Sequence, residues 1–388
     1  MSTENMMQNL NIEQLLAADG PTCLIVKAQF EPIGDTDRFQ PAGFPEMGHV
    51  IYDAPRVDKK GNVVPPEKVC IVDSAASMAN HLETLCFSNP ATGVLHQDLR
   101  GLPYVRCVTD RTPRVENGTV VPGSEDERDR TVVTTLTEGH RLASDYFLDG
   151  QLGDQNFRAA LRTGFGIVEI KKDKTYFVRP DDWWTIYTTI FRYDPNSLVH
   201  GILFAKEQIK ISRLLTAHLE AFGAARVGSA GVKFDRLGKT NSGQPIFAKD
   251  EETAERIQAT FLIDLGLLRS YGHGEQGLNK AQKSLLLALA LWKIHRLLDA
   301  PFRFRSGCHL RCTGRACTTD TGCALDEAAL KPDMPSAIEA CQFGPNPVTN
   351  VYYPATELFN PEKVPDDSSA APAEPEEEAG AGGEEDSQ

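Results

Sequence analysis

One stretch of the sequence, VCIVDSAASMANHLETLC at residues 69–86, passes from strand character to helix character within a few positions. The apolar run Val69–Val72 is typical of a short buried strand. Ser74 then offers its hydroxyl where a helix needs an N-cap. The apolar residues that follow recur at helical spacing: Ala75, Met78, Leu82, Leu85 and Cys86. The stretch therefore predicts a buried strand that leads directly into a helix.

The segments on either side continue this alternation of strand and helix. Strand composition, with many β-branched and aromatic residues, occurs at 23–30, 165–170, 176–178, 183–191, 201–205 and 301–306. Apolar residues recur at helical spacing within 211–222, 251–269 and 278–298. Short strands interrupted by helices and by two long insertions, 110–130 and 224–248, predict an α+β sheet domain with appendages. Glu116–Thr119 predicts a hairpin turn within the first insertion.

The charge of the chain is concentrated at one end. The 388 residues include 40 Lys and Arg and 54 Asp and Glu, for a formal net charge of -14. Nine of the acids lie in residues 365–388, which contain no Lys or Arg, so the other residues have a net charge of -5. We expect this acidic tail to be disordered. The modest charge of the remaining chain does not exclude an anionic partner.

Apolar patterning and cysteine usage indicate a soluble, cytoplasmic protein. The longest apolar run, Leu285–Trp292, has eight residues, whereas a bilayer-spanning helix needs roughly 18 or more. The first residues lack the basic and apolar stretches of a secretory signal. The nine Cys residues are an odd number and lie mainly in apolar segments. They suit a reducing compartment better than a disulfide framework.

Two strings that look like nucleotide-binding motifs lack the context that those motifs require. Gly272–Gly277 has the glycine spacing of a dinucleotide-binding turn, but the segment before it has a helical pattern where the motif needs a strand. Gly231–Thr240 ends like a phosphate-binding loop, yet six residues separate its glycines where that loop has four. Neither string therefore predicts nucleotide binding or hydrolysis.

A cysteine cluster and two histidines leave other chemistries open. His140 and His309 are candidates for a general acid, but no nucleophile or carboxylate pair accompanies them, which favours structural roles. Four cysteines lie within sixteen residues and form either an irregularly spaced zinc site or a set of free thiols in a loop: Cys308, Cys312, Cys317 and Cys323. The sequence contains no catalytic signature, and zinc is the one cofactor that remains open.

Basic residues outnumber acidic ones in two segments. Residues 293–315 contain six basic side chains and one acid, and residues 156–180 contain six and two. In Phe302–Arg305 phenylalanine and arginine alternate, so a strand would place both rings on one face and both guanidinium groups on the other. Either the rings pack in the core while the arginines contact phosphate, or the rings form a platform for base stacking. The apolar helix predicted just before favours the first arrangement.

Seven blocks of sequence, in a fixed order, resemble a known family. They are residues 38–45, 73–83, 101–106, 138–142, 231–236, 265–272 and 288–294. In this order they resemble the backbone subunit, which binds the guide RNA, of the type I CRISPR interference complex (Cascade) of subtype U, also called subtype G. This subunit belongs to the RAMP superfamily. The resemblance runs through roughly residues 22–310 and does not include the cysteine cluster or the acidic tail.

The resemblance implies a non-catalytic protein that binds CRISPR RNA. Its fold would be a modified RNA-recognition-motif (ferredoxin-like) palm with finger and thumb insertions. Copies would line up along the spacer of one guide RNA, with other Cascade subunits beside them, and would present the guide for pairing with a target DNA strand. No membrane partner is implied. Phosphate contact without base readout suits this role, because every guide has a different spacer.

These expectations give each part of the chain a role. We expect an N-terminal arm at 1–21, the palm at 22–315 with fingers within about 52–132 and a thumb at about 224–248, an extension at 316–364 and the acidic tail at 365–388. Two rival functions stay open: a RAMP-type RNA-processing endonuclease with His140 or His309 as general acid, and a zinc-containing nucleic-acid-binding module. The candidate RNA contacts are polar or basic: Lys27, Arg38, Gln40, Ser74, Ser77, Asn80, Arg141, Lys233, Arg236, Arg303 and Arg305.

Overall fold

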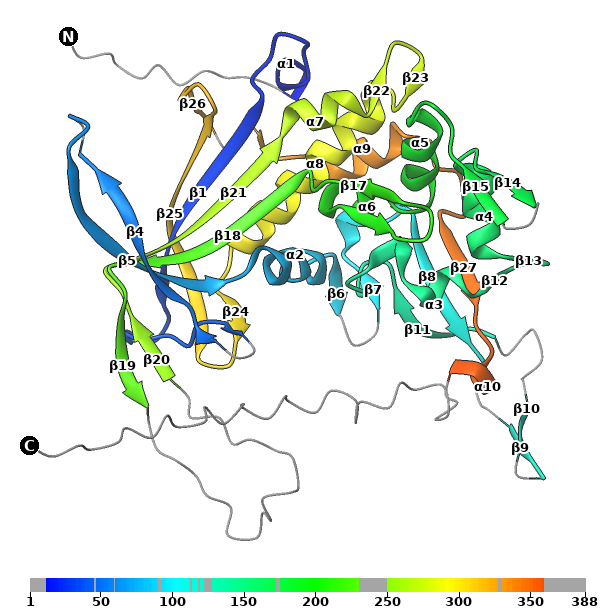
Figure 1. Ribbon diagram of the computed structural model, residues 1–388, viewed down its shortest axis with the longest axis horizontal. Helices are drawn as coiled ribbons and strands as arrows, with labels where there is room; N and C mark the ends of the chain where they lie inside the picture. Colours follow the sequence, from blue (N-terminus) through cyan, green and yellow to red (C-terminus); the bar gives the residue numbers. More distant parts are fainter. Residues whose placement is uncertain are drawn as a thin grey trace, which may run out of the picture.

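The computed structural model describes residues 12–44, 47–58, 60–89, 93–111, 114–117, 119–121, 128–171, 175–229, 250–326 and 330–358. Within these ranges the chain forms a mixed α+β fold around one large antiparallel sheet (Figure 1). The predicted α+β class is therefore confirmed. No helix in the described ranges has both the length and the apolar character needed to cross a membrane.

The large sheet has the strand order β24-β25-β1-β21-β18-β5-β4, and all of these neighbours are antiparallel. Because β1 lies between β21 and β25, the centre of the sheet joins the start of the chain to residues 256–319. A short strand, β26, pairs with β25 beside this path. The strands are β1 (Cys23–Pro32), β4 (Ile51–Val57), β5 (Val63–Asp73), β18 (Leu215–Phe222), β21 (Arg256–Asp264), β24 (Phe302–Arg305), β25 (Cys308–Thr319) and β26 (Ala324–Leu325).

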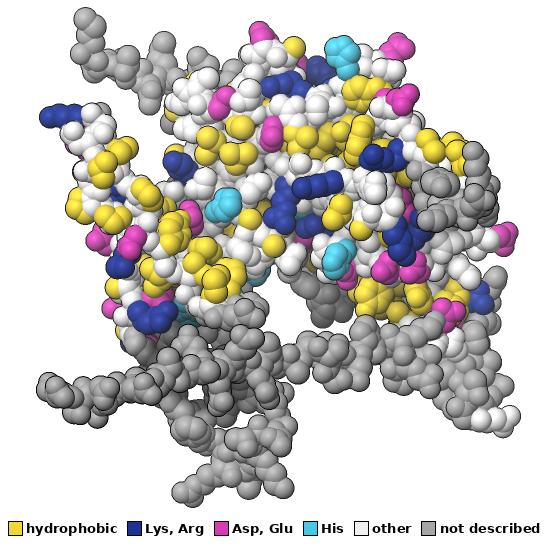
Figure 2. Space-filling model, viewed as in Figure 1, with side chains coloured by type: hydrophobic (Ala, Val, Ile, Leu, Met, Phe, Trp, Pro, Cys, Tyr) yellow, Lys and Arg dark blue, Asp and Glu magenta, His cyan; other side chains and the backbone are white. Residues whose placement is uncertain are grey.

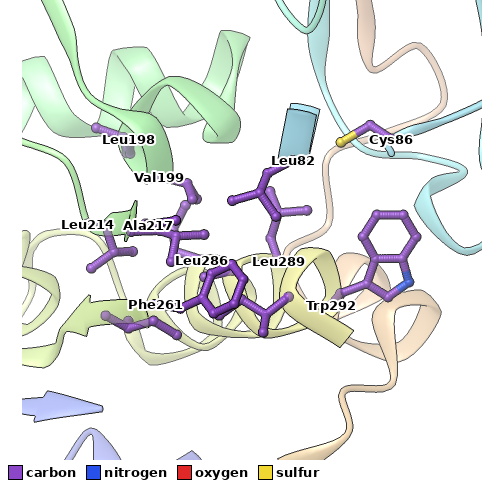
Figure 3. Packing of buried hydrophobic residues seen from close by; sticks show 14 of the residues in the cluster. Leu82, Cys86, Leu198, Val199, Leu214, Ala217, Phe261, Leu286, Leu289 and Trp292 are labelled. Atoms are coloured by element: carbon purple, nitrogen blue, oxygen red, sulfur yellow. The ribbon is translucent and has the colours of Figure 1, made fainter. Parts of the chain in front are cut away.

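Two helices, α2 (Ala75–Thr84) and α8 (Lys280–Leu298), supply the core on one face of this sheet. The strands alternate as a half-covered sheet requires: in β1 Val26 and Ala28 are buried while Lys27 between them is exposed. Figure 3 shows Leu82 of α2, Phe261 of β21 and Leu286 of α8 gathered in one apolar cluster. A capping box at Asn279 and Gln282 fixes where α8 begins.

The chain between α2 and β18 builds a second part, which joins a segment near the C-terminus (Figure 1). Its sheet has the order β11-β8-β27-β12-β13, with β27 parallel to β8. The strands are β8 (Tyr104–Thr109), β11 (Arg130–Thr134), β12 (Gln151–Leu152), β13 (Gln155–Asn156) and β27 (Val348–Tyr352). The helices around it are η1 (Gln97–Leu99), η3 (Arg141–Ala143), α3 (Asp145–Leu148), α4 (Phe157–Gly164), α5 (Trp184–Tyr193), α6 (Pro195–His200) and α9 (Met334–Glu339).

Short hairpins and helices make up the other described elements. The expected turn at Glu116–Thr119 is confirmed as a hairpin in which Asn117 has a φ of 54°, a conformation that Asn tolerates. The helices are α1 (Ile12–Leu15), α7 (Leu265–Ser270) and α10 (Ala355–Leu358). The paired strands are β2 (Gly43–Phe44) with β3 (Gly48–His49), β6 (Phe87–Asn89) with β7 (Val94–Leu95), β9 (Arg114–Glu116) with β10 (Thr119–Val121), β14 (Val168–Lys171) with β15 (Thr175–Val178), β16 (Ile202–Phe204) with β17 (Ile209–Ile211), β19 (Ala225–Ser229) with β20 (Asp250–Thr253), and β22 (Gly272–His273) with β23 (Gln276–Gly277).

Three predicted elements are wrong in type. The helix expected at 211–222 is mostly strand β18, in which Leu215, Ala217 and Leu219 face the core at alternate positions. The helix expected at 251–269 is largely β20 and β21, and only its last residues enter α7. The strand expected at 183–191 is helix α5, which packs against α6. Segments with this density of apolar residues satisfy both periods, so tertiary packing decides between them.

Several other elements predicted from the sequence agree with the structure in type and position. The predicted strands at 23–30, 69–72 and 301–306 and the helix at 278–298 are confirmed as β1, β5, β24 and α8. The expected extension at 316–364 contains the end of β25, then β26, α9, β27 and α10. In the expected N-terminal arm at 1–21, Leu15 of α1 is completely buried.

A network of buried charged and polar side chains links α2 and α8 to the second part of the fold. Glu83 of α2 accepts two hydrogen bonds from the Arg141 guanidinium, at 2.7 and 2.9 Å, and one from the Asn196 amide at 2.6 Å. The Lys293 ammonium of α8 donates to Asn196 and to His200. Buried charges are tolerated only when they are paired and hydrogen-bonded, so this network fixes how the two parts meet.

Asp194, the N-cap of α6, lies beside this network and accepts hydrogen bonds from the Asn196 N–H and the Ser197 hydroxyl. Burial raises the pKa of its carboxyl from 3.8 to about 6, and the nearby Glu83 adds to the effect. The folded state therefore retains a proton that the unfolded state releases at lower pH. Its stabilising contribution is complete below about pH 4 and is lost as the pH rises through 6.

We predict that Asp194→Asn removes this dependence, because the amide still caps the helix but does not ionise. The free energy of unfolding of the wild type, relative to that of the variant, should fall by roughly 3 kcal/mol between pH 4 and pH 7. Urea unfolding at several pH values measures this difference. If the difference in free energy of unfolding between the two proteins stays constant from pH 4 to pH 7, the pKa of Asp194 is not raised in the folded state.

Candidate nucleic-acid interface

Three segments that are far apart in the sequence meet where α2 begins. The Gln40 N–H donates to the Gly307 carbonyl oxygen at 2.9 Å, and the Arg305 guanidinium donates to the carbonyl oxygens of Val72 (2.6 Å) and Gln40 (3.4 Å). Gly307 has a φ of 76°, and a Cβ there would lie 3.2 Å from the Gln40 Cβ, so this turn requires glycine. The predicted contacts Gln40, Ser74, Ser77 and Arg305 are thus brought together.

The helix begins at Ser74 as the sequence predicts. Ser74 has an extended backbone, and its hydroxyl accepts a hydrogen bond from the Ser77 N–H at 3.2 Å. The next residues carry the free N–H groups of the first helical turn, which have no partner within the helix. Asn80 is exposed one turn further along α2. The start of α2 therefore presents N–H donors and small polar side chains, groups that bind phosphate without reading bases.

A buried carboxylate, Asp73, holds this arrangement together. Its two oxygens lie 2.9 Å from Arg305 Nη2 and 2.8 Å from His81 Nε2. Burial opposes ionisation of Asp73, but the hydrogen bond from His81 and the charge of Arg305 outweigh it and lower the pKa of the carboxyl. Asp73 is therefore ionised at neutral pH, and much of the hydrogen-bonding capacity of Arg305 is used inside the protein.

The alternating segment Phe302–Arg305 forms strand β24 at the edge of the sheet. The rings of Phe302 and Phe304 pack edge-on against the His81 ring, at 5.3 and 5.4 Å between centroids. Phe304 is buried and Phe302 is half-buried, whereas Arg303 is exposed. Of the two arrangements open from the sequence, the rings take the packing role.

The other predicted contacts are dispersed. Arg38 is half exposed, with its Nε 3.8 Å from a Glu251 oxygen. Lys27 lies on the opposite face of the sheet from α2, because its neighbours Val26 and Ala28 face the helices. Arg141 is buried in its ion pair with Glu83. Lys233 and Arg236, together with most of the expected thumb, lie outside the described residues.

A second basic group, which the sequence patterns did not predict, lies near the start of α2. Arg213 donates from Nη1 to the Ala75 carbonyl oxygen at 2.9 Å, and with Lys206 and Lys210 it lines a pocket of about 810 Å³. Figure 2 shows Lys and Arg side chains gathered over the region of β17 and α6. The signal in the sequence is three basic residues within eight positions, 206–213, with Glu207 among them.

The four clustered cysteines do not converge. Cys308, Cys312 and Cys317 lie along one strand, β25, which places the first and last about 30 Å apart at the usual rise per residue. Burial raises the pKa of the Cys308 thiol to about 12, so it stays protonated. In the ranges that the structure describes, no group of three or more His, Cys, Asp or Glu side chains could hold a metal ion. Strand geometry thus excludes a zinc ion shared by the four thiols, and of the four only Cys323 lies in a loop, between β25 and β26.

We predict that Arg305→Ala lowers the free energy of unfolding by about 2 kcal/mol or more, because Asp73 is left buried with His81 as its main partner. Arg303→Ala should change it by less than about 0.5 kcal/mol, because that side chain is exposed. Urea unfolding of the two variants measures both values. Equal losses of stability in the two variants would show that the pair with Asp73 contributes little.

We also predict that removal of divalent metal leaves the protein intact. Thermal unfolding in excess EDTA should give the same Tm as in buffer, because the cysteines cannot share an ion. Metal analysis of the purified chain is the companion measurement. A Tm lowered by more than about 5 °C, or one zinc per chain, would contradict the geometry.

Comparisons with known proteins agree with the resemblance at the level of a family. No curated protein matches the chain. A solved structure described as "CRISPR RNA-guided surveillance complex, pre-nicking" shares 12% identity, with 78% of this chain and 76% of that chain covered, at a TM-score of 0.27. A likeness this low carries no argument about the arrangement of the fold. The family model for CRISPR-associated protein GSU0053 matches residues 24–226, more than half of the sequence. The chain therefore belongs to the CRISPR-associated protein GSU0053 family.

Proposed function

We propose that this protein is a non-catalytic backbone subunit of a type I (subtype U or G) CRISPR surveillance complex. It would bind the CRISPR RNA in the cytoplasm, line up in several copies along the spacer and present the guide for pairing with target DNA. The observation that carries the proposal is the convergence of Gln40, Ser74, Ser77 and Arg305 at the start of α2. Membership of a CRISPR-associated family supports it.

The topology of the sheet supports an RNA-recognition-type palm within this proposal. Taken in chain order, β1, α2, β18, β21, α8 and β25 form a β-α-β-β-α-β series. In space the four strands have the order β25-β1-β21-β18, so that the first and third strands are central. This is the arrangement of a ferredoxin-like sheet. The long segment between α2 and β18, together with the hairpin of β4 and β5, would then be insertions into the palm.

Exposed apolar side chains on the hairpin of β4 and β5 support contact between copies. This hairpin projects from the edge of the large sheet (Figure 1). Tyr52, Val57 and Val63 on it are 41%, 67% and 87% exposed. Apolar groups on a projecting arm gain free energy when a neighbour covers them. In the expected thumb, β19 and β20 pair with each other, and residues 230–249 between them lie outside the described residues.

The contacts proposed for RNA are those that the fold leaves available. Arg303 on β24 and Arg38 in the segment after β1 are exposed basic side chains, and the first turn of α2 adds N–H donors. None of these groups selects among bases. A backbone subunit requires this property, because the guide sequence is read by pairing with DNA.

We predict that the purified chain binds unrelated spacer RNAs with affinities that agree within about threefold. Arg303→Ala should weaken all of them to the same extent and reduce the slope of log affinity against log salt by about 0.7, the effect of one lost phosphate contact on a single strand. Arg100→Ala, which removes an exposed arginine beside η1, is the matched control. Fluorescence anisotropy at several salt concentrations provides the measurement.

The outcomes separate this function from its rivals. A preference of more than about tenfold for one spacer, or no binding at all, would overturn the proposal. Site-specific cleavage of precursor repeat RNA that is lost in His140→Ala or His309→Ala would support the endonuclease instead. The His140 side chain is 83% exposed and lies 3.0 Å from Glu138, so its replacement should leave the fold intact.

A further inference from the structure

A basic pocket lies between the hairpin of β16 and β17, the end of α6, and η3. Its volume is about 810 Å³, which is ample for a nucleotide-sized group. Lys206 and Lys210 on the hairpin are exposed, and Arg213 is half-buried. Figure 2 shows the Lys and Arg side chains of this region gathered on one face of the molecule.

Three of the cations that line this pocket lack acidic partners. Among the described residues no ion pair joins Lys206, Lys210 or Arg213 to a carboxylate, whereas Arg141 and Arg158 in the lining are paired. Burial, and then the nearby Arg141, lower the pKa of the Arg213 guanidinium, and the charge of Glu83 offsets this only in part. The acid on the pocket wall, Asp145, is already bound to Arg158 at 2.9 Å.

One residue of the pocket wall, His200, has a buried donor. His200 is 1% exposed, and its Nε2 lies 2.8 Å from the Lys293 ammonium, which can only donate. Burial and the neighbouring cations lower the pKa of His200 well below its usual value, so the ring is neutral and its proton lies on Nδ1. This Nδ1–H has no partner among the described residues. Unsatisfied buried donors are rare and costly.

We propose that this pocket binds phosphate groups of the same RNA strand that crosses the start of α2. The inference rests on the proposed function and adds a second contact point to it. The two sites are adjacent: Arg305 bonds to the Val72 carbonyl and Arg213 to the Ala75 carbonyl, three residues apart in the chain.

Phosphate suits the pocket better than other anions. Two flexible ammonium groups and one guanidinium surround an open cavity, so the charge is spread over several positions as the oxygens of a phosphodiester require. The lining includes no Phe, Tyr or Trp side chain on which a base could stack. Binding here therefore ignores sequence, as at the start of α2.

The test is the double variant Lys206→Ala/Lys210→Ala, with Arg100→Ala/Lys331→Ala as a control that removes the same charge from exposed positions elsewhere. Both lysines are exposed, so the fold should be unaffected. Affinity for a spacer-length RNA at 0.15 M salt should fall roughly tenfold, and the salt slope should decrease by about 1.4 for two lost phosphate contacts. The control should leave the slope unchanged.

The outcomes are distinct. If the double variant binds RNA with the affinity and salt slope of the control, the pocket does not contact RNA and this inference is overturned, while the function proposed above stands. If adenosine monophosphate binds the wild type, and the double variant loses that binding without losing affinity for RNA, the pocket takes a free nucleotide and the inference is again overturned. If the wild type binds no RNA at all, the proposed function itself fails.

Discussion

A single buried carboxylate, that of Asp73, constrains the region on which the candidate interface depends. Its side chain has no exposure, so its charge must be met within the protein. The Ser74 N–H, His81 and Arg305 meet it at 2.8 to 2.9 Å. Asp73 ends β5, and its partners come from the start and middle of α2 and from β24, so one charge fixes three segments against one another. The position of the first turn of α2 follows from this requirement.

The other end of the same helix is fixed by the same rule. Glu83 in its last turn is buried and is matched by the Arg141 guanidinium and the Asn196 amide. Those residues belong to the long segment between α2 and β18, so this segment is tied to the large sheet through α2. A helix held by a buried carboxylate at both ends cannot rotate or slide without exposing a charge. That rigidity suits the proposed function, in which the helix presents the same donors to any guide sequence.

The sequence predicted the parts of this fold whose patterns are local. The alternation in β1, the cap at Ser74 and the long apolar run of α8 needed no knowledge of distant residues. The segments that became β18 and β21 were predicted as helices because their apolar residues suit both periods, and the choice is made by pairing with β1 and β5. Pairing across the fold is not visible in a local window.

Contacts between distant residues also limited how much of the candidate site could be predicted from the sequence. Gln40, Ser74 and Ser77 were predicted because they lie within the blocks that resemble a family, and the fold brings them together. Nothing in the sequence shows that Arg141 meets Glu83, fifty-eight residues before it. Lys206 and Lys210 were missed for the converse reason: Glu207 between them lowers the local charge, but in the fold it turns inward to Arg162.

The basic residues of this protein thus fall into two classes, which a count of charges does not distinguish. Arg141 and Arg305 are matched by buried carboxylates, and an added phosphate would have to compete with those partners at close range. Lys206, Lys210 and Arg303 are exposed, and their counterions exchange freely with the solvent. Affinity for a polyphosphate comes from the counterions that binding releases, so the second class supplies it. Arg141 and Arg305 help to determine where the exposed cations lie, because their ion pairs fix α2 and the strands around it. An interface of this kind can bind every guide alike while its geometry stays constant.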